Sequence, residues 1–129
     1  MNAASRVALE EARARLAQVA GTAPGSTRGE AQLTLSDELY AVARLLDGQM
    51  GLRRALSDPS ARPDDRAGLA SRLLRGKVSA PTLDVVATVS RQRWSRPLDL
   101  VEALQTLGTE AALDAADVRR ELDLSLIHI

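Results

Sequence analysis

Cysteine and phenylalanine are absent from this 129-residue chain, and histidine, tryptophan and tyrosine each occur once. Without cysteine the chain can form no disulfide, iron–sulfur cluster or thiolate zinc site. A single histidine, His128, excludes histidine-dependent catalytic triads and multi-histidine metal sites. The scarcity of aromatic residues argues against a binder of single-stranded nucleic acid, because such proteins need several side chains on which bases stack.

Long apolar runs are missing as well. No stretch approaches the roughly 18 consecutive apolar residues of a membrane span. The first 16 residues contain no basic segment followed by an apolar one, as a signal peptide would. We therefore expect no direct membrane insertion, and contact with a membrane only through partner proteins.

Charge of one sign does not dominate, because 17 basic residues balance 17 acidic ones. No long-range field therefore draws the whole chain to nucleic acid or to an anionic bilayer. The charges are unevenly placed, however: residues 51–100 contain ten basic and five acidic side chains, and residues 101–129 contain two and six. The middle of the chain is basic and its end is acidic.

Aliphatic residues at helical spacing are what the sequence has in abundance. Hydrophobic residues make up 45% of the chain, enough to build a core. Leu9, Ala12, Leu16 and Val19 predict a first helix over residues 5–20, with Ser5 as its cap. Residues 21–30 collect glycine, proline, serine and threonine, and this composition predicts a surface loop.

Further helices are predicted from caps, prolines and apolar stripes. The second begins near Thr34 or Ser36 and should bury a stripe made of Leu35, Leu39, Val42, Leu45 and Leu46. Others are expected over residues 51–57, 63–75, 80–94 and 97–107. Ser79 or Thr82 should cap the helix over 80–94, and Gly108 should end the helix over 97–107. One more helix should begin at Asp114.

The predicted fold is all-α, a compact bundle of about six short helices. We expect residues 1–113 to form one N-terminal helical bundle domain. Residues 114–124 should begin a further helix leading to a C-terminal domain that is absent from the chain. Residues 125–129 form an atypical tail that suggests a chimeric or artefactual end.

The segment RQRWSRP, residues 91–97, surrounds the single tryptophan with three arginines. As a nucleic-acid site, Trp94 would stack on a base while the arginines hold phosphates. The favoured interpretation is that Trp94 fills the core at a helix end and the arginines complement the helix dipole. A helix-turn-helix DNA-binding module over residues 63–94 is the alternative.

Catalytic signatures are missing. The carboxylates of Asp64-Asp65 and of Glu10-Glu11 are adjacent on helices and point in different directions, so they do not share a site. Gly76-Lys77 lacks the upstream glycine of a phosphate-binding loop. We therefore expect no enzyme, no cofactor and no metal, and an interaction protein instead.

Several sequence features follow one another in a characteristic order. They are Leu56 and Pro59 after a short helix, Leu73-Leu74 at a helix end, Arg93-Trp94 closing an apolar helix, and an amphipathic helix from Leu98 to Leu107. This series resembles the N-terminal domain of the delta subunit of bacterial F-type ATP synthase, a relative of the mitochondrial oligomycin-sensitivity-conferring protein. The resemblance spans residues 2 to about 122, and the first helix is similar to the actinobacterial branch.

The resemblance implies a non-catalytic peripheral-stalk subunit that holds the catalytic head against rotor torque and so supports proton-driven ATP synthesis. In that family the N-terminal domain binds the N-terminal helix of an alpha subunit between its first and fifth helices. The C-terminal domain joins the b subunit of the stalk. The implied location is the cytoplasmic face of the plasma membrane, as a peripheral part of the complex, with no nucleic-acid partner.

Carried over to this chain, the groove for the alpha-subunit helix lies between residues 5–20 and 80–94. Its implied contacts are Ala8, Ala12, Leu16, Val86, Val89 and Arg93. The small side chains on the first helix would let another helix approach closely. The two valines fit equally well as pure core, because one helix cannot present all its apolar residues to a partner.

Overall fold

The computed structural model describes residues 1–127, and within them six helices and no strand are present. The helices are α1 (Ala3–Ala20), α2 (Arg28–Asp47), α3 (Met50–Ser57), α4 (Pro63–Leu74), α5 (Ala80–Arg91) and α6 (Pro97–Ile127). The predicted all-α class is confirmed. Within the described part of the chain, no helix combines the length and the apolar character that crossing a bilayer requires.

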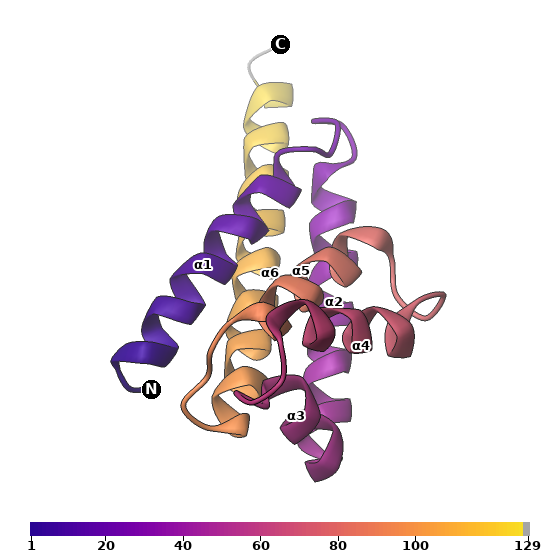
Figure 1. Cartoon of the computed structure of the whole chain (residues 1–129). Helices are drawn as coiled ribbons and strands as arrows, with labels where there is room; N and C mark the ends of the chain where they lie inside the picture. The colour runs from indigo at the N-terminus through magenta and orange to yellow at the C-terminus, as the bar shows by residue number, and fades with distance from the viewer. Residues whose placement is uncertain (128–129) are drawn as a thin grey trace.

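The two longest helices, α2 and α6, lie side by side and make the most extensive contact of the molecule (Figure 1). Helix α1 crosses them obliquely and contacts α5 and α6. Helices α3, α4 and α5 gather toward one end of the α2–α6 pair, where α4 packs against α5. As a result, α5 lies between α1 and α4.

Leucines and valines of all six helices form one apolar cluster at the centre of the bundle. On α2 the buried stripe contains Leu35, Leu39, Val42 and Leu46, as predicted. Leu45 was expected in the same stripe, but it is 45% exposed. The reason is geometric: successive residues on a helix are 100° apart, so the neighbour of the buried Leu46 points well away from the stripe.

Helix α2 begins earlier than the sequence predicts, at Arg28 rather than at Thr34 or Ser36. Tertiary contacts hold its first turn against α6. The Arg28 guanidinium lies 3.0 Å from the carboxylate of Asp114, and a Cβ on Gly29 would lie 3.8 Å from the Val118 side chain. The loop is consequently confined to residues 21–27.

Gly108 does not end a helix. Helix α6 continues through it as a single element, so the predicted end at Gly108 and new start at Asp114 are wrong. A Cβ on Gly108 would lie 3.3 Å from the ring of Tyr40 and 3.4 Å from the carbonyl oxygen of Ser36. The absence of a side chain at this position therefore allows α2 to pack close to α6. The expected division of the chain at residue 113 stays a prediction, and His128 and Ile129 of the expected tail lie outside the described residues.

Gly76 ends α4 as predicted and adopts a φ of +80°. Glycine enters this left-handed region without the steric cost that other residues meet. The turn that it makes possible lets the chain reverse between α4 and α5. As a result, α4 and α5 lie beside each other.

Candidate partner-binding site

Helices α1 and α5, the two expected walls of the groove, do pack against each other. Ala8, Ala12, Leu16, Val86 and Val89 are all buried and belong to the central apolar cluster. The space that the small side chains of α1 leave is thus filled by other parts of the same chain. None of the five lines the hollow along α5, although Leu16 borders a separate hollow of about 220 Å³ between α1, α2 and α6. Their role as partner contacts stays a prediction.

The segment that follows α5 carries the other two residues singled out from the sequence. Arg93 is exposed, two residues beyond the end of α5. Trp94 is only 4% exposed, and its indole Nε1 donates a hydrogen bond of 2.8 Å to the carbonyl oxygen of Val89. Trp94 therefore fills the core at the joint between α5 and α6, as the favoured interpretation predicted.

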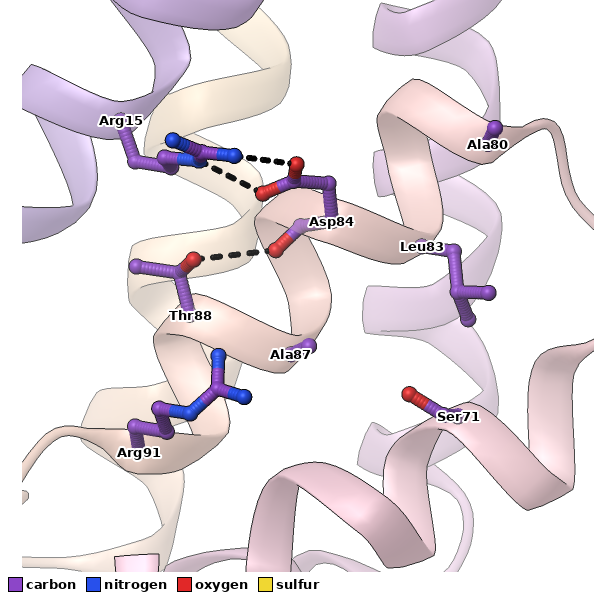
Figure 2. Close-up of a pocket in the computed structure, with 8 residues that line it drawn as sticks. All are labelled: Arg15, Ser71, Ala80, Leu83, Asp84, Ala87, Thr88 and Arg91. Atoms are coloured by element: carbon purple, nitrogen blue, oxygen red, sulfur yellow. Dashed lines mark hydrogen bonds and ion pairs between the residues drawn. The ribbon is translucent and has the colours of Figure 1, made fainter. Parts of the chain in front are cut away.

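An open trough lies along the face of α5 that points away from the core, and we call it the α5 trough (Figure 2). Its hollow of about 500 Å³ is bordered by α1 on one bank and α4 on the other. The lining residues are Arg15 of α1, Ser71 of α4, and Ala80, Leu83, Asp84, Ala87, Thr88 and Arg91 of α5. A smaller hollow of about 270 Å³ extends it along α1 past Gln18, Val19 and Thr22.

A bidentate ion pair joins α1 to α5 at the edge of the trough (Figure 2). Arg15 Nε donates to Asp84 Oδ1 at 2.7 Å, and Arg15 Nη2 donates to Oδ2 at 2.5 Å. These hydrogen bonds hold the pKa of Asp84 below its ordinary value. The Asp84 carboxylate is thus fully ionised at neutral pH and already engaged with a guanidinium.

The opposite bank is formed by α4. Arg91 Nε lies 3.1 Å from the carboxylate of Asp64, whose side chain is 91% exposed. The guanidinium of Arg72 folds back toward Gly68, whose added Cβ would lie 3.4 Å from Arg72 Nη1. Positions 64, 68, 71 and 75 fall on one stripe of a helix. Because Asp64 contacts Arg91 and Ser71 lines the hollow, this stripe borders the trough.

A carboxylate from α2 fixes the N-terminal end of α5. The backbone N–H of Ser79 donates to Glu38 at 3.0 Å, and the hydroxyls of Ser79 and Thr82 donate at 2.5 and 2.7 Å. Ser79 is the N-cap residue of α5, as predicted, but its side chain makes no capping hydrogen bond to a backbone N–H of the helix. Both turn instead to Glu38, whose negative charge is favourable at a helix N-terminus.

A buried arginine from α4 fixes the C-terminal end of α5. Arg66 Nε donates to the carbonyl oxygen of Ser90 at 2.8 Å, and Arg66 Nη2 donates to that of Arg91 at 3.0 Å. Its Nη1 group donates to the carbonyl oxygens of Asp58 and Ala61 at 2.9 and 2.6 Å. The guanidinium thus satisfies carbonyls that a helix end leaves without partners. Sequence reasoning missed this residue.

The N-terminus of α1 is tied to the α5–α6 turn by a polar cluster. The Ser5 hydroxyl donates to Asp99 Oδ2 at 2.8 Å and accepts the backbone N–H of Ser95 at 3.0 Å. Ser5 is therefore not the cap of α1; that residue is Asn2, which accepts the Ser5 N–H at 3.2 Å. Burial would raise the pKa of Asp99, but hydrogen bonds from Arg96 and Ser5 outweigh it and hold that pKa below its ordinary value.

The α5 trough does not bring together an acid, a base and a nucleophile. Among residues 1–127, no group of three metal-ligating side chains is present, and every buried side-chain nitrogen or oxygen has a hydrogen-bond partner. The outward face of α5 carries one arginine, which gives the helix-turn-helix alternative no support. What the site offers is a shallow surface with small apolar residues and charged borders, suited to a protein partner.

Comparison with known proteins connects this surface to a family. No family model matches the chain. The ATP synthase subunit delta of Parafrankia sp. is 44% identical over 126 residues, covering 95% of this chain and 45% of that protein. Those of Rhodococcus opacus and Streptomyces griseus are both 42% identical, again covering 95% of this chain and 44% of each protein.

The chain therefore spans less than half the length of the curated relatives that it matches. The match extends over nearly all of the bundle, including α1, α5 and the α5 trough. Along 95% of its length, this chain is similar to the actinobacterial ATP synthase delta subunit, which confirms the resemblance indicated by its motifs.

Proposed function

We propose that this chain is the head-binding part of a delta subunit in the peripheral stalk of an F-type ATP synthase. In this role it performs no chemistry; it anchors the catalytic head and thereby supports proton-driven ATP synthesis. The observation that carries the proposal is the 44% identity to an ATP synthase delta subunit over 95% of the chain.

The construction of the bundle supports such a role. A stator has to stay rigid while it binds, so it needs a packed core and fixed helices rather than reactive side chains. Helix α5 is held at one end by Glu38 and at the other by Arg66. The surface between α1 and α4 thus rests on a helix whose position is set by hydrogen bonds at both ends.

The proposed partner is the amphipathic N-terminal helix of an alpha subunit, lying along α5 beside α1. In this arrangement the α5 trough provides the contact surface. The buried residues Ala8, Ala12, Leu16, Val86 and Val89 support it from beneath, and Arg93 lies beyond its end. The stalk contact with a b subunit belongs to the part of the relatives that this chain does not span. The proposed location is the cytoplasmic face of the plasma membrane, within the complex.

A peptide titration tests the proposal. A synthetic peptide of the alpha-subunit N-terminus of Streptomyces griseus, whose delta subunit is a relative, is added to the isotope-labelled chain. We expect amide signals of α5 and α1 to shift at micromolar peptide. Ala80→Trp, which fills the trough, should weaken binding by about tenfold or more, whereas Ala41→Trp on the exposed side of α2 should not.

Absence of binding at micromolar peptide would argue strongly against the stator function. Retardation of duplex DNA at low salt, with steep release as salt rises, would favour the helix-turn-helix alternative instead. Peptide binding that Ala41→Trp blocks and Ala80→Trp does not would move the contact away from α5.

A further inference from the structure

A second hollow lies between the start of α2 and the second half of α6, at the end of the bundle away from α3 (Figure 1), and we call it the α2–α6 groove. Its volume is about 530 Å³, and it shares no lining residue with the α5 trough. Most of its lining is small or apolar, and includes Gly29, Leu33, Ala112, Ala115, Ala116 and Leu122. The groove is therefore a separate, mainly apolar surface.

The shape of the α2–α6 groove suits a helix. Gly29 and the three alanines have little or no side chain, so another helix can come close to both walls. Along α6 the lining runs from Ala112 to Asp123, which is about 16 Å or three helical turns. Leu33 and Leu122 border the same hollow and are 42% and 48% exposed. Contiguous apolar surface of this kind marks a contact site.

Charged side chains surround the apolar lining. Glu30 on α2, and Arg119 and Asp123 on α6, are exposed, and none of them forms an ion pair with another residue of the described chain. Arg28 and Asp114, by contrast, are paired with each other nearby. An apolar centre with a polar rim is the usual arrangement of a protein interface. Charges of both signs are thus available to an occupant of the groove.

The length of the relatives points to the occupant. The residues matched in the Parafrankia delta subunit are 45% of that protein, so more than half of it lies outside the match. The match covers the N-terminal part of the relatives, so most of their remaining length follows α6. The second half of α6 is one wall of the groove. A segment attached there meets the groove at a high effective concentration.

A covalently joined occupant also fits the small size of the groove. Separate chains lose translational and rotational freedom when they associate, and stable pairs bury roughly 800 Å² on each partner. A groove about 16 Å long offers a single helix a short contact. A covalent link removes much of the entropic cost of association, so that a short contact is sufficient. These considerations favour a segment of the same subunit over a second copy of the bundle.

We propose that the α2–α6 groove holds a helix from the remainder of the delta subunit. The two parts of the subunit are then packed against each other, instead of being joined only through the chain that follows α6. This proposal rests on the proposed function, because it takes the chain to be one part of a delta subunit. It assigns the bundle a second contact surface, built from different residues than the surface proposed to face the head.

The first test compares this chain alone with a full-length chimera, in which residues 1–123 replace the matching stretch of the Parafrankia delta subunit. Ala116→Cys and Ala41→Cys are made in both forms, because both alanines are exposed and the chain has no cysteine of its own. We expect a maleimide to label position 116 about tenfold more slowly in the chimera, and position 41 at the same rate in both forms. Mass spectrometry of the labelled peptides identifies the position.

The second test removes the apolar contact. In the chimera that carries Ala116→Cys, Leu33→Lys and Leu122→Lys should each restore labelling of position 116 to within about twofold of the rate in this chain alone. Leu45→Lys is the matched control, because Leu45 is 45% exposed on α2 but does not line the groove, and it should leave position 116 shielded. Circular dichroism of the same variants of this chain alone confirms that each is folded.

Three outcomes overturn the proposal. One is equal labelling of position 116 in both forms. Another is labelling that slows in this chain alone as its concentration rises, because the occupant is then a second copy. The third is equal shielding of positions 116 and 41 in the chimera, because the remainder then covers α2 without selecting the groove.

Binding of the alpha-subunit peptide to the chimera separates this proposal from the proposed function. If the peptide fails to bind while position 116 is shielded, head binding is overturned and the groove proposal stands. If the peptide binds while position 116 is labelled equally in both forms, head binding stands and the groove proposal is overturned. Shielding of position 116 that Leu33→Lys abolishes and Leu45→Lys keeps supports the proposal.

Discussion

The α2–α6 pair and the surroundings of α5 are held together in different ways. Between α2 and α6 the contact is close and mainly apolar: Leu104 and Leu107 are fully buried, and Gly108 lets the Tyr40 ring approach the α6 backbone. The Arg28–Asp114 ion pair adds a polar contact at the first turn of α2. Around α5, polar groups from three other helices fix its ends and its flank, through Glu38, Arg66 and Arg15. The first region provides stability, and the second sets the position of the helix that carries the proposed binding surface.

The largest expected effect comes from the apolar region. Leu104→Ala removes a fully buried side chain between α2 and α6, and we expect it to lower the free energy of unfolding by about 3 kcal/mol. Chemical denaturation measures the change. Leu113→Ala on the same helix is the control, since Leu113 is 61% exposed and should cost far less. Equal losses for both variants would contradict the assignment of the core.

A smaller effect is expected at the C-terminal end of α5. Arg66→Met keeps much of the side-chain volume but leaves the carbonyls of Ser90 and Arg91 without their donor, at a cost of about 2 kcal/mol. Hydrogen exchange should quicken in the last turn of α5, and Trp94 fluorescence should shift. Arg62→Met, an exposed arginine before α4, should change neither. Faster exchange throughout the bundle would instead mean that Arg66 supports the whole fold.

The polar cluster at Asp99 should give a still smaller change that depends on pH. The pKa of Asp99 is lowered in the folded state, so its ionised form contributes stability above the unfolded-state pKa of about 4. That contribution is lost as the pH falls through the lower folded-state pKa. Asp99→Asn should cost about 1 kcal/mol at pH 7 and should flatten the loss of stability below pH 4. An unchanged acid slope would show that other carboxylates dominate.

The smallest effect is expected for the Arg15–Asp84 pair, because both side chains are more than a third exposed. A double-mutant cycle with Arg15→Gln and Asp84→Asn should give a favourable coupling in low salt that shrinks as ionic strength rises. As for Asp99, the pKa of Asp84 is lowered in the folded state. Its ionised form therefore stabilises the fold above the unfolded-state pKa, and this contribution is lost as the pH falls through the folded-state pKa. A coupling insensitive to salt would mean that the pair is more shielded than its exposure indicates.

The spacing of apolar residues predicted the helices and the apolar faces of α2 and α6. The helices, the buried leucines of α2 and α6, and Trp94 as a core residue follow from spacing and composition, which act over one or two turns. Gly108 was misjudged because a glycine that ends a helix and one that admits a neighbouring ring look alike in sequence. The distinction depends on Tyr40, 68 residues earlier in the chain.

The hydrogen bonds and ion pair that hold α5 could not be predicted either, because they join residues that are far apart in the sequence. Arg66 resembles any other arginine on a helix, and only the fold brings it to the carbonyls of Ser90 and Arg91, some 25 residues later. Glu38 meets Ser79 across 41 residues. The predicted contacts Val86 and Val89 were assigned to a groove that the chain's own helices close. The open stripe on the opposite face, through Asp84 and Thr88, became apparent only from the packing.

The hydrogen bonds that hold the two ends of α5 also bear on how the bundle would transmit force. In the proposed complex, a pull on the partner helix along α5 would be passed to α2 through the Glu38 hydrogen bonds and to α4 through those of Arg66. Each end has several hydrogen bonds that share the load, and α2 is joined along its length to α6. Tension applied at the surface would thereby be shared between α4 and the α2–α6 pair, because α5 is held by hydrogen bonds at both ends.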